Sequence, residues 1–173
     1  MTRIRKLALG VLLASAASAA SAPERFTPQQ LEADFYFDLG PAEIDVAGYP
    51  RAQQQGYATF ASVCSRCHTL ARPINSPIVA RADWRRYIKR MHARSRIQPD
   101  KTFTAEQAKR VVEFLAYDAK VRKIARRAEF DAETERLKKL FVEARAERSR
   151  LRSESDARKV KPYGDRPSAT PRP

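Results

Sequence analysis

Two cysteines and a histidine lie side by side in a pattern that is typical of a reactive or cofactor-binding site. Cys64 and Cys67 are the only cysteines among the 173 residues, and two residues separate them in the stretch FASVCSRCHTLARPINSP at 60–77. His68, one of two histidines in the chain, follows Cys67 directly. Thiol and imidazole groups ligate metals, exchange with disulfides and attach cofactors, so the spacing must discriminate between these chemistries.

Three of the chemistries that use a Cys-x-x-Cys pair fit this sequence poorly. A structural zinc site needs four ligands, and beyond the two thiols and His68 only His92 remains. A thiol–disulfide oxidoreductase carries the pair at the start of a helix that follows a strand, and no strand pattern surrounds Cys64. A disulfide between Cys64 and Cys67 would close a very small loop, stabilise little and leave His68 unexplained.

The pattern Cys-x-x-Cys-His indicates covalent attachment of one haem. Each thiol adds to one of the two haem vinyl groups, and the adjacent histidine supplies an axial nitrogen to the iron. We therefore expect Cys64 and Cys67 to hold haem c covalently and His68 to be the first axial ligand.

The second axial ligand is expected on a helix with the sequence ADWRRYIKRMHAR at 82–94. Trp84, Ile88 and Met91 have the i, i+4, i+7 spacing of one apolar helical face. Met91 is the main candidate, because Met1, the other methionine, is lost with the leader. His92 is the alternative, about 100° round the helix, and an open or water-bound iron is a third arrangement.

The remaining pattern predicts an all-α domain. Residues 50–64 are expected to form a helix, residues 69–80 a loop because of Pro73 and Pro77, and residues from 105 onward another helix. Thr104 and Gln107 have the spacing of a capping box at the start of that last helix.

Two sets of residues give the chain a resemblance to a known family. Gly56, Phe60 and Cys64 recur every four residues, and the stretch RVVEFLAY at 110–117 carries an apolar and aromatic face. Over residues 50–125 the chain resembles the class I cytochromes c. This resemblance implies a small fold around one covalent haem, in which Gly56 lets the last helix of the domain cross the first at close range.

A narrower resemblance is to the small monohaem cytochrome subunit of bacterial sulfite dehydrogenases. It rests on CSRCHTL, on NSP at 75–77, on Trp84 and on Met91. It implies that the carbonyl of Pro77 or Pro73 accepts the ring N–H of His68. Trp84 is expected either to reach a haem propionate or simply to pack in the core. The segment HARSRIQPDK departs from the shorter turn of that subunit, and the tail after Ala128 has no counterpart there.

The N-terminus predicts export to the periplasm. Three basic residues within the first six precede an apolar run at 7–13 that is too short to span a bilayer, followed by small residues. We expect a signal peptide at 1–20, cut after Ala19 or Ala20. The formal net charge of +14 then becomes about +11.

Changes in composition divide the rest of the chain. We expect an irregular lead-in at 21–49, a cytochrome c domain at 50–128, a charged helical extension at 129–158 and a disordered, proline-rich tail at 159–173. The extension has a seven-residue apolar series, Phe130, Leu137, Ala144 and Leu151. Its other positions are mostly charged, so a lone charged helix is favoured over a pairing one.

These features together predict an electron carrier and not an enzyme. With both axial positions filled, the iron would have no place for a substrate, and its chemistry would be single-electron transfer. The alternatives are a dedicated subunit of a periplasmic dehydrogenase, and a haem sensor or peroxidase-type protein if the sixth position is open. The basic surface favours an acidic redox protein or dehydrogenase subunit as partner, or peripheral contact with an anionic membrane. Nucleic acid is not expected as a partner. The sequence makes no prediction of the oligomeric state.

Overall fold

The regular structure of the protein is helical throughout the part that the computed structural model describes, residues 25–159. The predicted all-α class is therefore confirmed for these residues. The expected signal peptide at 1–20 and residues 160–173 of the expected tail lie outside this range. Between residues 25 and 159, every helix is too short or too polar to cross a membrane.

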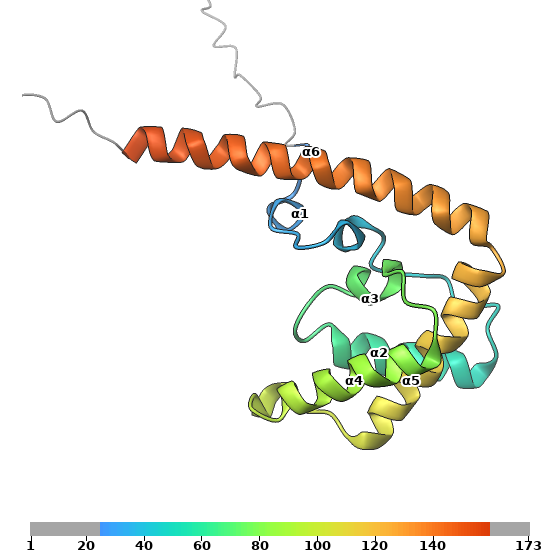
Figure 1. Ribbon diagram of the computed structural model, residues 1–173. Helices are drawn as coiled ribbons and strands as arrows, with labels where there is room; N and C mark the ends of the chain where they lie inside the picture. Colours follow the sequence, from blue (N-terminus) through green and yellow to red (C-terminus); the bar gives the residue numbers. More distant parts are fainter. Residues whose placement is uncertain (1–24, 160–173) are drawn as a thin grey trace, which may run out of the picture.

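Three helices enclose the main core. They are α2 (Arg51–Cys64), α4 (Arg81–Ser95) and α5 (Ala105–Asp118), and α5 packs against both of the others (Figure 1). The buried residues of this core are Phe60, Ile74, Trp84, Ile88, Val111, Val112, Phe114 and Leu115. Both apolar patterns singled out in the sequence, the one around Phe60 and the one in RVVEFLAY, thus meet in one cluster.

Gly56 is where α2 and α5 approach most tightly. A β-carbon built on Gly56 would lie 2.9 Å from Cβ of Phe114, closer than real side chains come. Because Phe114 is fully buried and Cβ is the root of its side chain, this contact cannot be relieved by a rotamer change. The close crossing expected at Gly56 is therefore present.

Gly56→Ala is expected to lower the free energy of unfolding by about 1 kcal/mol or more. Alanine favours a helix over glycine by roughly 1 kcal/mol, but overpacking a core typically costs about 1–3 kcal/mol, and here the contact joins two backbones. Urea denaturation measures the change. Gly48→Ala is the matched control, because a β-carbon there meets nothing within 4 Å; equal stability losses in the two variants would contradict the close crossing.

The segment after His68 is not the loop that its two prolines predicted. A short helix, α3 (Ala71–Asn75), includes Pro73. Proline is tolerated there because it stands in the first turn of the helix, where backbone N–H groups make no hydrogen bond within the helix and the one that proline lacks is not missed. The loop expectation holds only for the residues on either side of α3.

The chain runs on from α5 with two changes of geometry before the last helix. The capping box at the start of α5 is confirmed, since Thr104 Oγ1 accepts from Gln107 N at 3.1 Å and Gln107 Oε1 accepts from Thr104 N at 2.8 Å. A π-helix, η3 (Ala119–Ile124), continues α5 directly. After a turn at 125–126 the chain enters α6 (Arg127–Lys159), which runs back across the molecule (Figure 1).

Helix α6 packs against another part of the chain, so the favoured prediction of a lone charged helix at 129–158 is wrong. Leu137 and Ala144 of α6, two members of the seven-residue series, are each 1% exposed. They pack against Phe26, Ala33 and Leu39 of the lead-in, and so the partner of α6 is the N-terminal segment of the same chain. That segment contains α1 (Pro28–Leu31) and a 3-10 helix, η1 (Tyr36–Leu39).

Polar contacts join this lead-in to α3. Arg72 Nε and Nη2 each donate to Asp38 at 2.8 Å, a bidentate pair. The buried Asn75 side chain donates to the carbonyl of Pro41 at 3.0 Å, and Gly40 lies so close to it that a β-carbon there would clash. The lead-in is therefore fixed to the segment that follows His68. The remaining element is a second 3-10 helix, η2 (Pro99–Lys101), between α4 and α5.

Candidate functional site

One cavity brings the chemically distinctive residues together. Its volume is about 670 Å³, within the range of small-molecule and cofactor pockets. Cys64, Cys67, His68 and Met91 all line it. Most of its remaining wall is apolar and includes Val63, Ile78, Ile88, Phe103, Val111 and Leu115.

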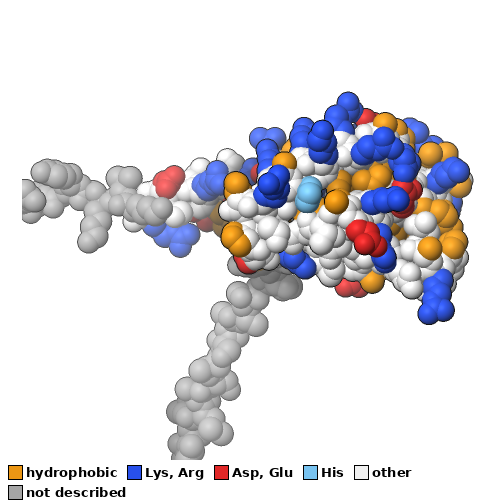
Figure 2. All heavy atoms as spheres, turned by 90° about the horizontal axis from the view of Figure 1, so that it is seen from below, with side chains coloured by type: hydrophobic (Ala, Val, Ile, Leu, Met, Phe, Trp, Pro, Cys, Tyr) orange, Lys and Arg blue, Asp and Glu red, His pale blue; other side chains and the backbone are white. Residues whose placement is uncertain are grey.

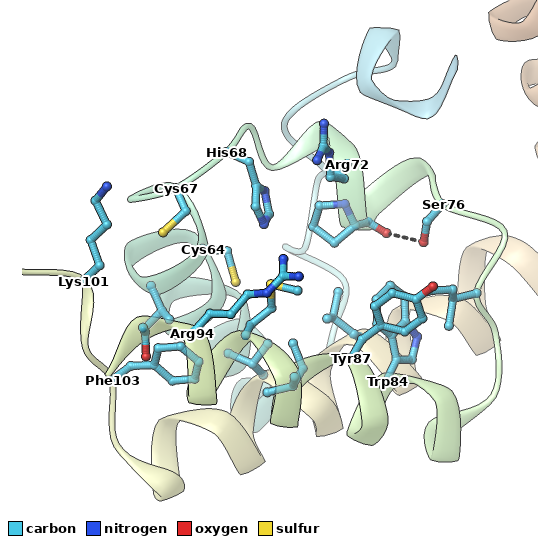
Figure 3. Close-up of a pocket in the computed structure, with 18 of the residues that line it drawn as sticks. Cys64, Cys67, His68, Arg72, Ser76, Trp84, Tyr87, Arg94, Lys101 and Phe103 are labelled. Atoms are coloured by element: carbon cyan, nitrogen blue, oxygen red, sulfur yellow. Dashed lines mark hydrogen bonds between the residues drawn. The ribbon is translucent and has the colours of Figure 1, made fainter. Parts of the chain in front are cut away.

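The two cysteines reach the cavity from the end of α2. Cys64 is the last residue of the helix, and Cys67 lies in the turn that follows, where its N–H donates to the Cys64 carbonyl at 3.4 Å. Figure 3 shows both sulfurs on the side of the cavity next to His68. Both thiols are free. The turn thus presents two thiols and an imidazole to one space.

Burial, helped by the neighbouring Cys67, raises the pKa of the Cys64 thiol to about 12. Cysteines that attack disulfides have the opposite property, a lowered pKa that makes them thiolates at neutral pH. The environment of Cys64 therefore suits a protonated thiol more than a redox-active thiolate.

His68 is held in the tautomer that an axial ligand requires. Its Nδ1 lies 2.9 Å from the carbonyl oxygen of Thr69. A carbonyl only accepts, so Nδ1 carries the proton and Nε2 keeps a lone pair available for a metal. The ring projects into the cavity (Figure 3).

The acceptor of this hydrogen bond differs from the expected one. The resemblance implied the carbonyl of Pro73 or Pro77, but the structure uses that of Thr69. The Pro73 carbonyl accepts instead from Ser76 Oγ at 3.1 Å and from Lys123 Nζ at 3.3 Å. Pro73 and Pro77 remain at the site as lining residues.

The structure separates the two candidates for the second axial position. Met91 lines the cavity, as its place on the face of Trp84 and Ile88 predicted. His92 does not line it, and its ring lies 5.1 Å from the ring of Phe103. Helical geometry explains the difference, because neighbouring residues diverge by about 100°.

Trp84 supplies a buried donor without an acceptor. The residue is 3% exposed and lines the cavity, and its Nε1 has no hydrogen-bond partner among residues 25–159. Buried donors nearly always have a partner, either in the protein or on a bound group. Because this nitrogen has almost no accessible surface, it does not open onto the cavity, and Trp84 packs in the main core, as one of its two expected roles requires.

The charged groups of the cavity wall are all cations. Arg72, Arg94 and Lys101 line it, and none of the lining residues is Asp or Glu. Arg72 is paired with Asp34 and Asp38. Arg94 extends from α4 across the cavity (Figure 3); because its side chain is long and exposed, it is the group that must move for a planar cofactor.

Two groups of residues at the site were not anticipated from the sequence. Phe35 and Phe37, which stack at 4.9 Å between ring centroids, bring the lead-in into the cavity wall. Lys123 of η3 is almost fully buried behind the wall formed by residues 73–78. The cluster of aromatic residues in DFYFDLG could have indicated that Phe35 and Phe37 pack at the site. Nothing in the sequence distinguished Lys123 from its charged neighbours.

Comparisons with known proteins add no assignment to this description. No protein-family model, curated protein or solved structure matches the chain. Within residues 25–159, His, Cys, Asp and Glu side chains nowhere gather in threes in a way that could hold a metal ion by themselves. The site is therefore interpreted from its own geometry and chemistry.

Proposed function

We propose that the protein is a monohaem c-type cytochrome that transfers single electrons between redox proteins of the periplasm. The observation that carries this proposal is the convergence of Cys64, Cys67, His68 and Met91 on one largely apolar cavity of about 670 Å³. A thiol pair, an imidazole and a thioether are the complete protein ligand set of a His/Met haem c.

The residues of the chain have separable tasks in this proposal. Cys64 and Cys67 would hold the haem through two thioether bonds, one to each vinyl group, and the hydrogen of each thiol would go to the second carbon of that vinyl group. His68 offers Nε2 because Thr69 holds the proton on Nδ1. Met91 offers its sulfur from α4, and Trp84 forms part of the cavity wall.

A bound haem supplies an iron that accepts and releases one electron. The apolar wall excludes water from it, and a methionine sulfur raises the reduction potential. With His68 and Met91 both committed, no coordination position is left for a substrate. The placement of Met91 on the cavity wall thus favours a carrier over a sensor or peroxidase-type protein with an open site.

The charge of the surface supports an acidic partner. Figure 2 shows a face rich in Lys and Arg side chains with hydrophobic side chains between them. On α4 alone the exposed cations are Arg81, Arg85, Arg86, Lys89, Arg90, Arg94. This helix also carries Met91, so positive charge surrounds the methionine side of the site. We propose a redox protein or dehydrogenase subunit with an acidic surface as the partner.

We expect electron transfer to an acidic acceptor protein to slow as salt is added. Attraction between opposite charges raises association rates roughly 10- to 1,000-fold at low ionic strength and is lost as the Debye length shrinks. Stopped-flow oxidation of the reduced protein, from about 0.01 M to about 0.5 M salt, measures this. A basic acceptor protein of similar potential is the control and should show the opposite trend; a rate that is independent of salt with both acceptors would contradict the steering account.

A further inference from the structure

The π-helix η3 turns two consecutive cations toward the wall of the cavity. In η3 a hydrogen bond spans five residues, from Ala125 N to the Lys120 carbonyl at 3.0 Å. Such an insertion shifts the register of a helix, and π-helical turns are frequent at functional sites. Here Arg122 Nη2 donates to the Ile74 carbonyl at 2.9 Å, and the next residue, Lys123, reaches the same segment.

Lys123 is held by backbone oxygens alone. Its Nζ donates to the carbonyls of Ser76 at 2.7 Å, Pro73 at 3.3 Å and Ile78 at 3.3 Å. An ammonium group has three donors, and all three are used. Ser76, Pro73 and Ile78 all line the cavity, so the ammonium lies directly behind its wall.

The charge of Lys123 is not neutralised by a carboxylate. The buried Asp118 is taken by Arg122, whose Nε and Nη2 donate to its two oxygens at 2.7 Å, and by Tyr49 Oη at 3.0 Å. Within residues 25–159 no salt bridge involves Lys123, which is 1% exposed. When Lys123 is protonated, the cluster of Asp118, Arg122 and Lys123 therefore carries one excess positive charge inside the protein.

The groups around Lys123 act on its proton in opposite directions. Burial, the largest influence, lowers its pKa, Asp118 raises it and Arg122 lowers it, and the resulting pKa is about 7. The helices α4 and α6 pack aromatic rings against Lys123. Its Nζ lies 5.2 Å from the ring centroid of Trp84 in α4 and 5.5 Å from the ring centroid of Phe130 in α6. A buried amine that titrates near neutral pH is far from the pKa of about 10.4 of a free lysine.

We propose that Lys123 is a positioning and tuning residue, whose ammonium fixes the cavity wall through the carbonyls of Pro73, Ser76 and Ile78 and raises the reduction potential of the site. This inference rests on the proposed function. A positive charge behind the wall favours the state with one more electron. The electron that arrives from a redox partner protein raises the pKa of Lys123. At pH values close to that pKa, part of the neutral amine therefore takes a proton from water and leaves hydroxide in the solvent.

The test compares the reduction potential of Lys123→Met with that of the wild-type holoprotein between about pH 6 and about pH 8.5, on either side of the pKa of Lys123. At the lower pH the wild type carries the ammonium and should have the higher reduction potential. Its equilibrium constant for reduction by a reference redox couple should be several-fold larger than that of Lys123→Met. At the higher pH the wild-type amine is neutral, and the two potentials should converge. Lys120→Met is the matched control, because it removes an exposed charge from the same helix and should change little at either pH.

A purely structural role of Lys123 would give a different result. Equal potentials of wild type and Lys123→Met at about pH 6, with unchanged haem spectra, would overturn the inference while leaving the proposed function intact. If Lys123→Met yields no holoprotein, the ¹³Cε resonance of Lys123 in the wild type decides. It should titrate at higher pH in the reduced protein than in the oxidised one, and equal pKa values would overturn the inference. A wild-type protein without covalent haem would overturn both proposals.

Discussion

Replacing both Cys64 and Cys67 by alanine is expected to abolish covalent haem and to reduce the yield of folded protein sharply. The sulfurs are the only attachment points, and the cavity that the haem would fill borders the main core. Without its occupant, that cavity exposes apolar side chains of α2, α4 and α5 to water, and lost burial of this kind costs stability. Each single variant should retain part of the haem, held through the remaining thioether.

Haem staining after denaturing electrophoresis measures this loss, with export and expression matched by immunoblot. Ser65→Ala is the control within the same turn, because Ser65 is exposed between the cysteines and does not line the cavity. It should stain like the wild type. Full haem retention by the double cysteine variant would eliminate the covalent assignment.

Met91→Ala is expected to have the second large effect. Loss of the thioether should open one axial position, so that small ligands such as cyanide or carbon monoxide bind readily. It should also lower the reduction potential, because a methionine ligand raises it; axial ligand sets span about 0.8 V in haem proteins. Potentiometric titration and ligand-binding spectra measure the two effects.

His92→Ala is the matched comparison, since it changes the next residue of the same helix. His92 lies outside the cavity and packs against Phe103. Its removal should leave ligand binding and potential nearly unchanged. The reverse pattern, with an open iron in His92→Ala and a closed one in Met91→Ala, would assign the axial position to His92.

The parts of the fold that could be predicted are those governed by short-range rules. The capping box of Thr104, the apolar face of Trp84 and Ile88 and the close crossing at Gly56 each follow from residue spacing and side-chain size. The approach of Cys64 and His68 to one space also follows from their separation by only four positions.

The parts that could not be predicted depend on contacts between distant segments. The seven-residue series of α6 was visible, but its partner lies about a hundred residues away in the lead-in, around Phe26 and Leu39. The proline-based prediction of a loop was wrong because Pro73 stands in the first turn of α3. Lys123 is buried within a π-helix, and spacing rules for regular helices do not anticipate the shift in register that such a turn makes.

Covalent binding of one haem through Cys64 and Cys67 would be visible in the intact mass of the wild-type protein. The full chain from Met1 should be expressed in a bacterium that attaches haem in the periplasm, then purified and denatured. We expect the mass of the purified polypeptide plus one haem, with tandem mass spectrometry placing that added mass on the peptide that contains Cys64 and Cys67. A mass equal to that of the unmodified chain, or lower by two hydrogen atoms because of a disulfide, would contradict covalent attachment.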